Sequence, residues 1–274
     1  MSGDADLPQG FAERYGPRAL ILGGSEGIGA SFADALAAIG LDLTLVARSA
    51  QSLEATAATL RERHGVQVDT RQLDLTGPDL ETAAQALIAS HDFGLVIYNA
   101  GATHGVGLFL DEPVDKALNL VRLNCAGPLI FAHHALSAMR AKGRGGLILI
   151  SSMSGMAGSG YVAGYAASKA FEITLAEGLH WELAREGVDV MCAVATLTDT
   201  PAMRRSGIQM DADPNFVAMD ADAVALGALQ NLGAAAVWFA AGEEAGQALR
   251  AAPRAALTDT MSRTSARLWG LVPD

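Results

Sequence analysis

Short apolar runs alternate with longer stretches of helical periodicity along most of the chain. The apolar runs predict strands over residues 18–22, 41–47, 66–73, 93–98, 145–151, 188–194 and 236–240. The stretches between them predict helices over residues 27–39, 50–64, 79–90, 113–141, 161–186 and 220–233. Strands that alternate with helices build β-α-β crossovers, and strands covered on both faces are apolar throughout. We therefore predict an α/β fold, a single doubly wound domain whose parallel sheet of about seven strands carries helices on both faces.

Three segments lie outside this alternation or interrupt it. Residues 18–242 hold all the predicted strands and form the predicted domain. We expect residues 1–17 to be a leader that packs on the surface. Residues 198–218, with "TPAMRRSG" and "MDADPN", predict an irregular insert that acts as a substrate lid. Residues 243–274 predict a C-terminal helical extension.

The charge of the chain excludes two classes of partner. Its 19 basic and 30 acidic side chains give a net charge of −11, which repels nucleic acid and anionic membranes. We therefore expect a small-molecule ligand in a local pocket. Residues 223–242 are uncharged, but Gln230 and Asn231 interrupt them, so we expect a helix and a strand rather than a membrane span.

The cysteine and histidine content predicts a reduced protein without a metal. Cys125 and Cys192 are too few for a disulfide framework in a chain of 274 residues, and they predict free thiols in a cytoplasmic protein. The six histidines are scattered, and no cluster has the spacing of metal ligands, so we expect no metal site. The acidic N-terminus lacks the apolar stretch of a signal peptide.

The stretch "GYAASKA" places Tyr165 four residues before Lys169. On a helix this spacing puts both side chains on one face. Phenols are poor acids near neutral pH, and a neighbouring cation favours their charged form. The pair is therefore a candidate proton donor with its tuning group, although the same pattern also arises by chance.

A glycine-rich turn, "GGSEGIG", follows the first predicted strand and opens the first helix. Gly23, Gly27 and Gly29 permit a tight turn and a close approach of the backbone to a ligand. The helix N-terminus behind them offers free N–H groups to a pyrophosphate. In a doubly wound sheet, dinucleotides bind at this place.

The end of the second predicted strand bears on the choice of dinucleotide. An acidic residue there would bind the ribose of NAD, but the strand ends in Arg48 and Ser49. A guanidinium binds a 2′-phosphate, so NADP(H) is preferred and NAD(H) is the alternative. Glu26 in the glycine turn acts against a phosphate, and a solvated surface position is the other interpretation of Arg48.

Taken together, these motifs resemble those of the short-chain dehydrogenase/reductase family. The resemblance covers roughly residues 15–240 and rests on six motifs in the order that the family has. They are "GGSEGIG", "LDL" after strand three, "YNAG" after strand four, Asn124, "ISSMSG" and "YAASK". Leu22 and Tyr98 replace the Thr and Asn that are common in the family, at positions that are mainly structural. The resemblance implies a Rossmann fold and NAD(P)-dependent interconversion of ketones and secondary alcohols.

The resemblance also implies roles for individual residues. The catalytic set would be Ser152, Tyr165, Lys169 and Asn124, with Asn124 holding a water that contacts Lys169. Ser151 and Ser154 rank below Ser152. Besides Tyr165 and Lys169, the cofactor would contact Gly23, Ser25, Glu26, Gly27, Ile28, Gly29, Arg48, Ser49, Asp74, Leu75, Asn99, Ala100, Gly101, Thr198 and Thr200. Each polar member also has an ordinary structural use; for Asp74, that use is to cap the next segment.

The substrate is less well defined by the sequence. Met153, Met156 and Met203 are candidate contacts for a hydrophobic substrate, and core packing is their alternative role. His104 follows "NAGAT" and is either a substrate contact or a solvated loop residue. Ala195 and Thr196 replace the Pro-Gly pair that usually begins the loop after strand six in the family, so the wall around the nicotinamide departs from the family pattern.

We therefore expect an NADP(H)-dependent oxidoreductase that acts on a steroid-like or other bulky ketone. The alternatives are a 3-oxoacyl thioester reductase and, from another class, a non-catalytic NADP-binding sensor or scaffold. The long helices over 113–141 and 161–186 would pair two chains in a homodimer or homotetramer, as is common in the family. The extension either caps the substrate cleft or replaces a subunit contact.

Overall fold

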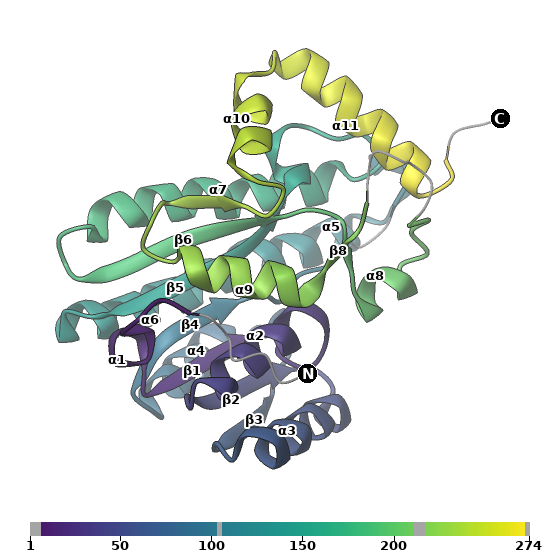
Figure 1. The fold of residues 1–274 in the computed structure, drawn as a ribbon. Coiled ribbons are helices and arrows are strands. Elements are labelled where there is room, and N and C mark those ends of the chain that lie inside the picture. The colour runs from purple at the N-terminus through teal and green to yellow at the C-terminus, as the bar shows by residue number, and fades with distance from the viewer. Residues whose placement is uncertain (1–6, 103–105, 211–216, 272–274) are drawn as a thin grey trace.

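The centre of the fold is a seven-stranded parallel sheet, as the alternation predicts. The computed structural model describes residues 7–102, 106–210 and 217–271 (Figure 1). The strands are β1 (Arg18–Leu22), β2 (Asp42–Ala47), β3 (Val68–Gln72), β4 (Phe93–Tyr98), β5 (Gly145–Ser152), β6 (Val188–Ala195) and β9 (Val237–Phe239). Their order is β3-β2-β1-β4-β5-β6-β9, and every neighbouring pair is parallel. The predicted α/β fold with a single doubly wound sheet is therefore confirmed.

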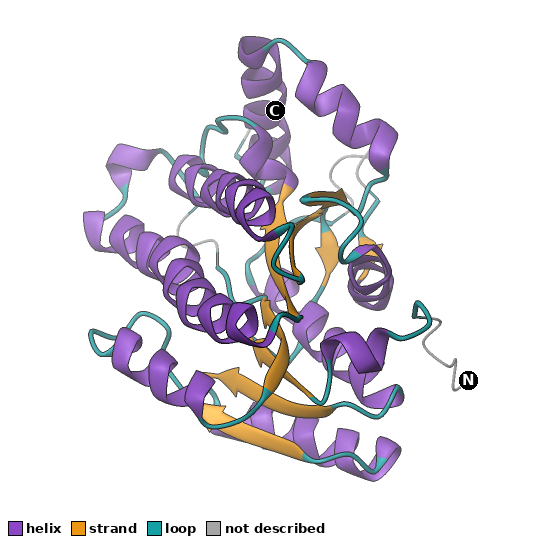
Figure 2. Cartoon of the chain, turned by 90° about the vertical axis from the view of Figure 1, so that its left-hand side faces the viewer, coloured by secondary structure: helices purple, strands orange, loops and turns teal. Residues whose placement is uncertain are grey.

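Helices cover both faces of this sheet, so its strands are apolar on both sides (Figure 2). One face carries α2 (Gly27–Ala38), α3 (Ala50–His64) and α9 (Ala221–Asn231). The other face carries α4 (Leu80–Ala89), α6 (Gly127–Lys142) and α7 (Ala163–Leu183). Residues 223–242 thus form part of α9 and then β9, as expected. None of the helices in the described part of the chain has the length and hydropathy that a bilayer span requires.

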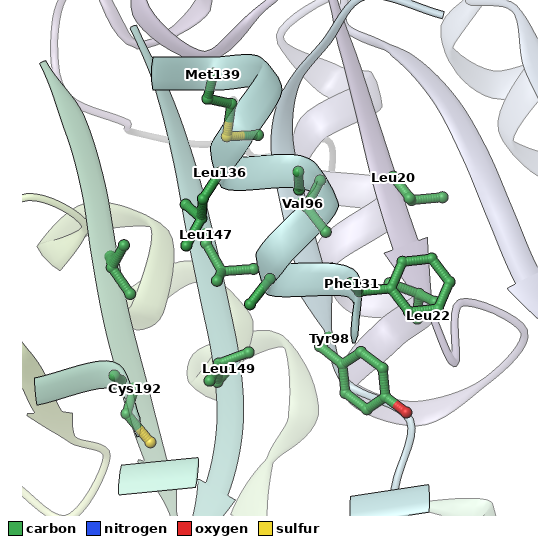
Figure 3. Packing of buried hydrophobic residues seen from close by; sticks show 14 of the residues in the cluster. Leu20, Leu22, Val96, Tyr98, Phe131, Leu136, Met139, Leu147, Leu149 and Cys192 are labelled. Atoms are coloured by element: carbon green, nitrogen blue, oxygen red, sulfur yellow. The ribbon is translucent and has the colours of Figure 1, made fainter. Parts of the chain in front are cut away.

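Alternation along the strands divides the apolar side chains between two cores. Leu20 and Leu22 of β1 lie in the core under α6, whereas Ala19 and Ile21 lie in the core under α2. Figure 3 shows the first core, where α6 packs Phe131, Leu136 and Met139 against side chains of β1, β4 and β5. The strands are continuously apolar in sequence because helices bury their side chains on both faces of the sheet.

The helix predicted over 113–141 is interrupted at its middle. It consists of α5 (Val114–Val121), a π-helical turn η2 (Arg122–Ala126) and α6. The Tyr98 hydroxyl donates a 2.7 Å hydrogen bond to the Leu123 carbonyl, and a Cβ at Gly127 would lie 2.0 Å from the same hydroxyl. Pro128 also lacks the N–H that would continue the helical ladder. The inserted phenol and the missing donor account for the widened turn.

The order of the strands creates the crevice in which a ligand can bind. The chain runs from β1 outward to β3 and then returns to place β4 on the other side of β1. The carboxyl ends of β1 and β4 lie side by side, with Leu22 opposite Tyr98. The connections that follow these two strands lead to helices on opposite faces of the sheet, and folds of this kind bind ligands at such a crevice.

The described residues before β1 contribute side chains to the core, which a segment on the surface would not do. Helix α1 (Phe11–Tyr15) buries the side chains of Phe11 and Tyr15 in the core under α2. The Tyr15 hydroxyl donates a 2.7 Å hydrogen bond to Asp189 in β6. The expectation that residues 1–17 only pack on the surface therefore differs from the structure at these two side chains, because their apolar area completes the core.

The lid segment and the C-terminal extension lie at the end of the molecule that carries the crevice. The first contains β7 (Thr198–Asp199) and α8 (Pro201–Arg205), and β8 (Met219–Asp220) pairs with β7. The second forms α10 (Glu243–Ala251) and α11 (Arg254–Leu268). In Figure 1, α11 lies above α5 and α8, and two small apolar clusters join it to the body of the protein.

Candidate active site

The glycine turn between β1 and α2 is shaped to receive a phosphate group. Gly23 and Gly27 have φ angles of +82° and +55°, a conformation that favours glycine. A Cβ at Gly29 would lie 2.0 Å from the Gly23 carbonyl oxygen, so the turn closes tightly upon itself. No side chain caps the N-terminus of α2, so its first N–H groups are available to an anion. The turn therefore fits the pyrophosphate of a dinucleotide.

The other residues of the turn have structural partners. The Ser25 carbonyl accepts a 2.9 Å hydrogen bond from Thr56, and Ile28 packs against the core under α2. Glu26 forms an ion pair with Arg205 of α8, with one N–O distance of 3.0 Å. The predicted conflict between Glu26 and a phosphate is thus reduced, because a guanidinium balances the carboxylate.

Arg48 and Ser49 lie where β2 ends. Arg48 is exposed, and its charge helps to lower the pKa of Asp74, after the larger effect of hydrogen bonds from Thr76. Ser49 is the N-cap of α3, and its hydroxyl accepts a 3.2 Å hydrogen bond from the Ser52 N–H. Arg48 therefore remains available to a ligand at this edge, whereas Ser49 also has a structural use.

Asp74 and Leu75 follow β3 on the same side of the crevice. Asp74 Oδ1 accepts hydrogen bonds from the Thr76 N–H and hydroxyl, at 2.9 and 2.7 Å. The capping alternative for Asp74 is thus realised, and it leaves Oδ2 outside these bonds. Leu75 is buried in the core under α6. A carboxylate oxygen beside an apolar surface suits an adenine ring with its amino group.

The segment after β4 joins the glycine turn to the buried polar groups of the site. Asn99 Nδ2 donates a 3.0 Å hydrogen bond to the Gly23 carbonyl. A Cβ at Gly23 would lie 2.8 Å from the Ala100 nitrogen, so the two backbones touch. A Cβ at Gly101 would lie 3.1 Å from Lys169 Nζ and 3.6 Å from Asn124 Oδ1. Gly101 thus leaves space between an ammonium and an amide oxygen.

Three members of the expected catalytic set lie on two neighbouring helical elements. Tyr165 and Lys169 are on α7, with Lys169 Nζ 6.0 Å from the centroid of the Tyr165 ring. Tyr165 is half-buried, whereas Lys169 is buried. Asn124 is in the π-helical turn and donates a 3.0 Å hydrogen bond to the Ser168 hydroxyl. Its Oδ1 is buried and accepts no hydrogen bond from the described residues, so it can receive one from a water or a ligand.

The structure separates the three candidate serines after β5. Ser151 is buried, and its hydroxyl donates a 2.7 Å hydrogen bond to the Lys169 carbonyl. Ser152 is the last residue of β5 and is half-buried; its hydroxyl oxygen accepts a 3.2 Å hydrogen bond from the Ser154 N–H. The Ser152 hydroxyl hydrogen is not used in this bond, so it can be donated to a ligand.

The segment after β6 contains two predicted cofactor residues, Thr198 and Thr200, and Thr200 lies near the glycine turn. The methyl group of Thr200 would lie 3.0 Å from a Cβ at Gly27. The Thr200 hydroxyl caps α8 by accepting a 3.2 Å hydrogen bond from the Met203 N–H. The Thr198 hydroxyl donates a 3.1 Å hydrogen bond to the Thr196 carbonyl. Thr200, just before α8, therefore lies directly against the glycine turn.

The candidate substrate residues surround the same end of the molecule. Met153 and Met156 are partly buried against the core under α6, and Met156 also touches the cluster of Ala157, Leu257 and Met261. Met203 packs against the cluster of Leu197, Ile208 and Leu268. Both the core role and the substrate role suit these half-buried side chains. His104 lies outside the described residues.

Comparison with known proteins identifies the family. Residues 17–211, more than half of the chain, match the sequence model of a family described as short chain dehydrogenase. The chain belongs to this family. It is an NAD(P)-dependent short-chain dehydrogenase that acts on CH–OH groups.

Curated relatives of this short-chain dehydrogenase act on different substrates. A 7beta-hydroxysteroid dehydrogenase of Clostridium sardiniense is 34% identical over 211 residues, which cover 76% of this chain and 78% of that protein. A very-long-chain 3-oxoacyl-CoA reductase of Podospora anserina is 32% identical over 214 residues, which cover 74% of this chain and 63% of that protein.

Two solved structures share the fold of this dehydrogenase. A short-chain dehydrogenase of Sphingobium yanoikuyae in complex with NADPH has a TM-score of 0.78 and 32% identity, over 84% of this chain and 90% of that chain. A structure that addresses 7beta-hydroxysteroid dehydrogenase stereoselectivity has a TM-score of 0.83 and 26% identity, over 92% of this chain and 98% of that chain.

The site of this dehydrogenase also contains a residue that the sequence analysis missed. Glu172 lies three residues after Lys169 on α7, and its carboxylate accepts hydrogen bonds from Lys169 Nζ at 2.9 and 3.0 Å. Burial alone would lower the pKa of Lys169, but the Glu172 carboxylate raises it above its ordinary value. The spacing of three residues in "SKAFE" is the signal that identifies such a pair on a helix.

Proposed function

We propose that this dehydrogenase interconverts a ketone and a secondary alcohol on a bulky hydrophobic substrate with NADP(H). The observation that carries this proposal is the cluster of Tyr165, Lys169 and Asn124 beside the end of β5. Lys169 Nζ lies 6.0 Å from the Tyr165 ring centroid, and Asn124 Oδ1 is buried without a described donor. These groups can hold and move a proton next to a crevice that fits a dinucleotide.

The protein side chains would act on the carbonyl oxygen of the substrate. A bound nicotinamide nucleotide supplies or accepts the hydride. Tyr165 donates a proton to the oxygen in reduction and takes it back in oxidation, and Ser152 donates a hydrogen bond to it. The Lys169 ammonium places a positive charge 6.0 Å from the centroid of the Tyr165 ring. Positioned acid-base groups of this kind contribute roughly 10²–10⁴-fold to the rate.

Several residues would hold the cofactor. The open N-terminus of α2 would bind the pyrophosphate, and Asp74 Oδ2 beside Leu75 would receive the adenine. Arg48 supports a preference for NADP(H), because it is an exposed cation where β2 ends and no acid stands there. The NADPH complex of the relative from Sphingobium yanoikuyae supports the same preference.

The apolar surroundings of the crevice support a bulky substrate. Met156 and Met203 each pack against a small apolar cluster that includes side chains of α11, and in this proposal they and Met153 line the substrate cleft. In this proposal residues 198–218 are the lid and residues 243–274 cap the cleft. The 7beta-hydroxysteroid dehydrogenase of Clostridium sardiniense, at 34% identity, supports a steroid-like ketone.

A 3-oxoacyl thioester is the second candidate substrate, because the reductase of Podospora anserina is similar over 74% of this chain. The decisive experiment measures NADPH oxidation by the purified protein with a steroid ketone, a 3-oxoacyl thioester and a small ketone. We expect the highest kcat/KM with the steroid ketone. Faster turnover of the thioester would select the second candidate. Binding of NADPH without turnover of any carbonyl would leave the sensor or scaffold alternative.

We further propose that the protein is a homodimer or a homotetramer in the cytoplasm. Val114, Leu118 and Val121 form an exposed apolar stripe on α5, and Trp181 of the neighbouring α7 is 82% exposed. Water-exposed apolar surface of this kind favours association. The free thiols of Cys125 and Cys192 support a reducing compartment. Sedimentation analysis of the protein and of Leu118→Asp tests the assembly, because the charge should shift the protein toward monomers.

A further inference from the structure

Glu172 is a buried carboxylate beside the catalytic cluster, and presenting Tyr165 and Lys169 does not by itself require one. Its side chain is 1% exposed, and that of Lys169 is 5% exposed. The two groups form an ion pair on one face of α7, with both carboxylate oxygens within 3.0 Å of the Lys169 nitrogen. Burying a carboxylate is strongly unfavourable unless it is paired. A helix that only had to present Tyr165 and Lys169 would carry an apolar residue at this position.

The Lys169 ammonium is fully engaged by oxygens on its core side. It donates a 2.8 Å hydrogen bond to the Ile150 carbonyl in addition to its bonds to the two Glu172 oxygens. An ammonium has three N–H groups, and these three oxygens account for all of them. Any hydroxyl of a bound cofactor or water that accepts from Lys169 therefore competes with the Glu172 carboxylate.

The other groups that face the Glu172 carboxyl are polar but neutral near pH 7. They come from every element packed around it: Tyr98 of β4, Cys125 of η2, Ser151 of β5 and Cys192 of β6. Burial, followed by the Glu172 charge, raises the pKa of Tyr98, Cys125 and Cys192. Lys169 is the only cation among the described groups that act on Glu172. Where Glu172 is ionised, its carboxylate and the Lys169 ammonium therefore balance each other.

Resting on the proposed function, we propose that Glu172 is a positioning residue of the catalytic centre. It holds the Lys169 ammonium toward the core, balances its charge, and thereby sets the pH range in which Tyr165 exchanges a proton with the substrate. By accepting from the Lys169 N–H groups, Glu172 also weakens the hydrogen bonds that Lys169 can donate to a bound cofactor. Glu172 touches neither substrate nor cofactor, and it acts only through Lys169.

The variant Glu172→Gln tests both parts, because it keeps an oxygen acceptor and removes the charge. The unbalanced Lys169 cation should favour the charged form of Tyr165, so the rise of alcohol oxidation with pH should move to lower pH by roughly one pH unit. NADPH should also bind more tightly, by roughly threefold to tenfold, the factor that one released hydrogen bond contributes. The binding is measured by NADPH fluorescence and needs no turnover.

Two further variants complete the experiment. Glu177→Gln makes the same change in charge on α7, where Glu177 is exposed and pairs with Arg250 at 3.2 Å, and it should leave both measurements unchanged. Glu172→Asp keeps the charge but withdraws it by one methylene, so it should give shifts between the wild type and Glu172→Gln. If Glu172→Gln does not fold, the pH profile and NADPH affinity of Glu172→Asp are compared with those of Glu177→Gln instead, and the expected shifts are smaller.

A folded Glu172→Gln variant whose pH profile stays in place or moves to higher pH, with unchanged NADPH affinity, overturns the inference. If Glu172→Gln is unfolded, a Glu172→Asp variant with the pH profile and NADPH affinity of the wild type also overturns the inference. A wild-type protein that turns over no carbonyl refutes the proposed function instead. The NADPH affinities of the variants would then still test the restraint on Lys169.

Discussion

The side chain of Asn99 donates a 3.0 Å hydrogen bond to the carbonyl oxygen of Gly23. This bond ties the carboxyl ends of β4 and β1 together at the crevice. It also fixes the peptide that faces Gly29, where a Cβ would lie 2.0 Å from the same oxygen and 2.7 Å from Asn99 Nδ2. The shape of the glycine turn, which follows β1, thus depends on Asn99, which follows β4.

Gly29→Ala should therefore disrupt the turn. The methyl group would push the Gly23 carbonyl away from Asn99, and we expect NADPH affinity to fall by at least roughly tenfold, with a lower melting temperature. NADPH fluorescence and thermal unfolding measure the two effects. Gly178→Ala is the matched control, because its Cβ would meet no atom within 4 Å in α7 and should stabilise the helix by roughly 0.5–1 kcal/mol. Equal NADPH affinity in both variants would contradict the proposed geometry.

Tyr165→Phe should remove the proton donor and leave the dinucleotide site intact. We expect carbonyl reduction to fall by at least roughly 10²-fold, because the phenol hydroxyl supplies the acid-base step. NADPH fluorescence should give the wild-type affinity. If the variant keeps wild-type activity, another group donates the proton.

Arg48→Asp should move the cofactor preference from NADPH toward NADH. The substitution removes a cation that can pair with the 2′-phosphate and adds a carboxylate that can accept from ribose hydroxyls. The measurement is the ratio of kcat/KM with NADPH to that with NADH, which we expect to fall by at least roughly tenfold. Arg185→Asp is the control, because it makes the same charge change on an exposed residue just before β6, at the amino ends of the strands, whereas Arg48 follows β2 at their carboxyl ends. An unchanged ratio in Arg48→Asp would show that Arg48 does not contact the phosphate.

The stability of the protein should depend on pH through Glu172. Burial raises the pKa of Glu172 from 4.5 to about 7, although Lys169 opposes the shift. Between these values the folded state binds more protons than the unfolded state, so the free energy of unfolding falls as pH rises. The contribution is complete below pH 4.5 and is lost as the pH rises through about 7.

Denaturant unfolding from pH 5 to pH 8 measures this dependence in the wild type and in Glu172→Gln. The variant should lose the fall in stability across the window, since an amide does not titrate. Asp34 and Asp74 have lowered pKa values, so their effects belong to pH values below 3.8 and do not overlap with it. Parallel curves for the two proteins would refute the assignment of this slope to Glu172.

Leu268→Ala should loosen the contact between α11 and the lid. Leu268 is buried beside Leu197 and Ile208, and truncation of such a side chain costs about 2–5 kcal/mol. We expect KM for a bulky ketone to rise several-fold, while NADPH affinity stays unchanged. Leu271→Ala removes the same atoms from a 37% exposed residue and should leave KM unchanged. Equal KM values for the two variants would show that α11 does not support the lid.

Local sequence patterns were sufficient to predict much of this structure. The strands follow from apolar runs, and the helix over residues 50–64 has the predicted bounds because Ser49 caps its start and Gly65 ends it. The glycine turn was predictable too, since its conformation depends on neighbouring glycines. The choice of Ser152 over Ser151 as the catalytic serine stays a prediction.

Contacts between distant segments explain what the sequence analysis did not predict. The π-helical turn around Asn124 depends on Tyr98, which inserts from β4. The ion pair of Glu26 with Arg205 joins residues 179 positions apart, and nothing near Glu26 in the chain indicates its partner. Only the fold brings such groups together, so a single sequence does not reveal them.

Helix α11 is also joined to the segment that follows Ser152, because the Gly160 N–H donates a 2.7 Å hydrogen bond to Ser262 and the Ser159 hydroxyl lies 2.8 Å from that of Ser265. The proposed cleft is thus roofed by a stretch of chain that contributes no member of the proposed catalytic set. In this proposal the C-terminal extension affects which substrates fit, while the proposed catalytic residues lie elsewhere in the chain. Grafting residues 243–271 from a relative onto this body is therefore a route to a catalyst with a new substrate range.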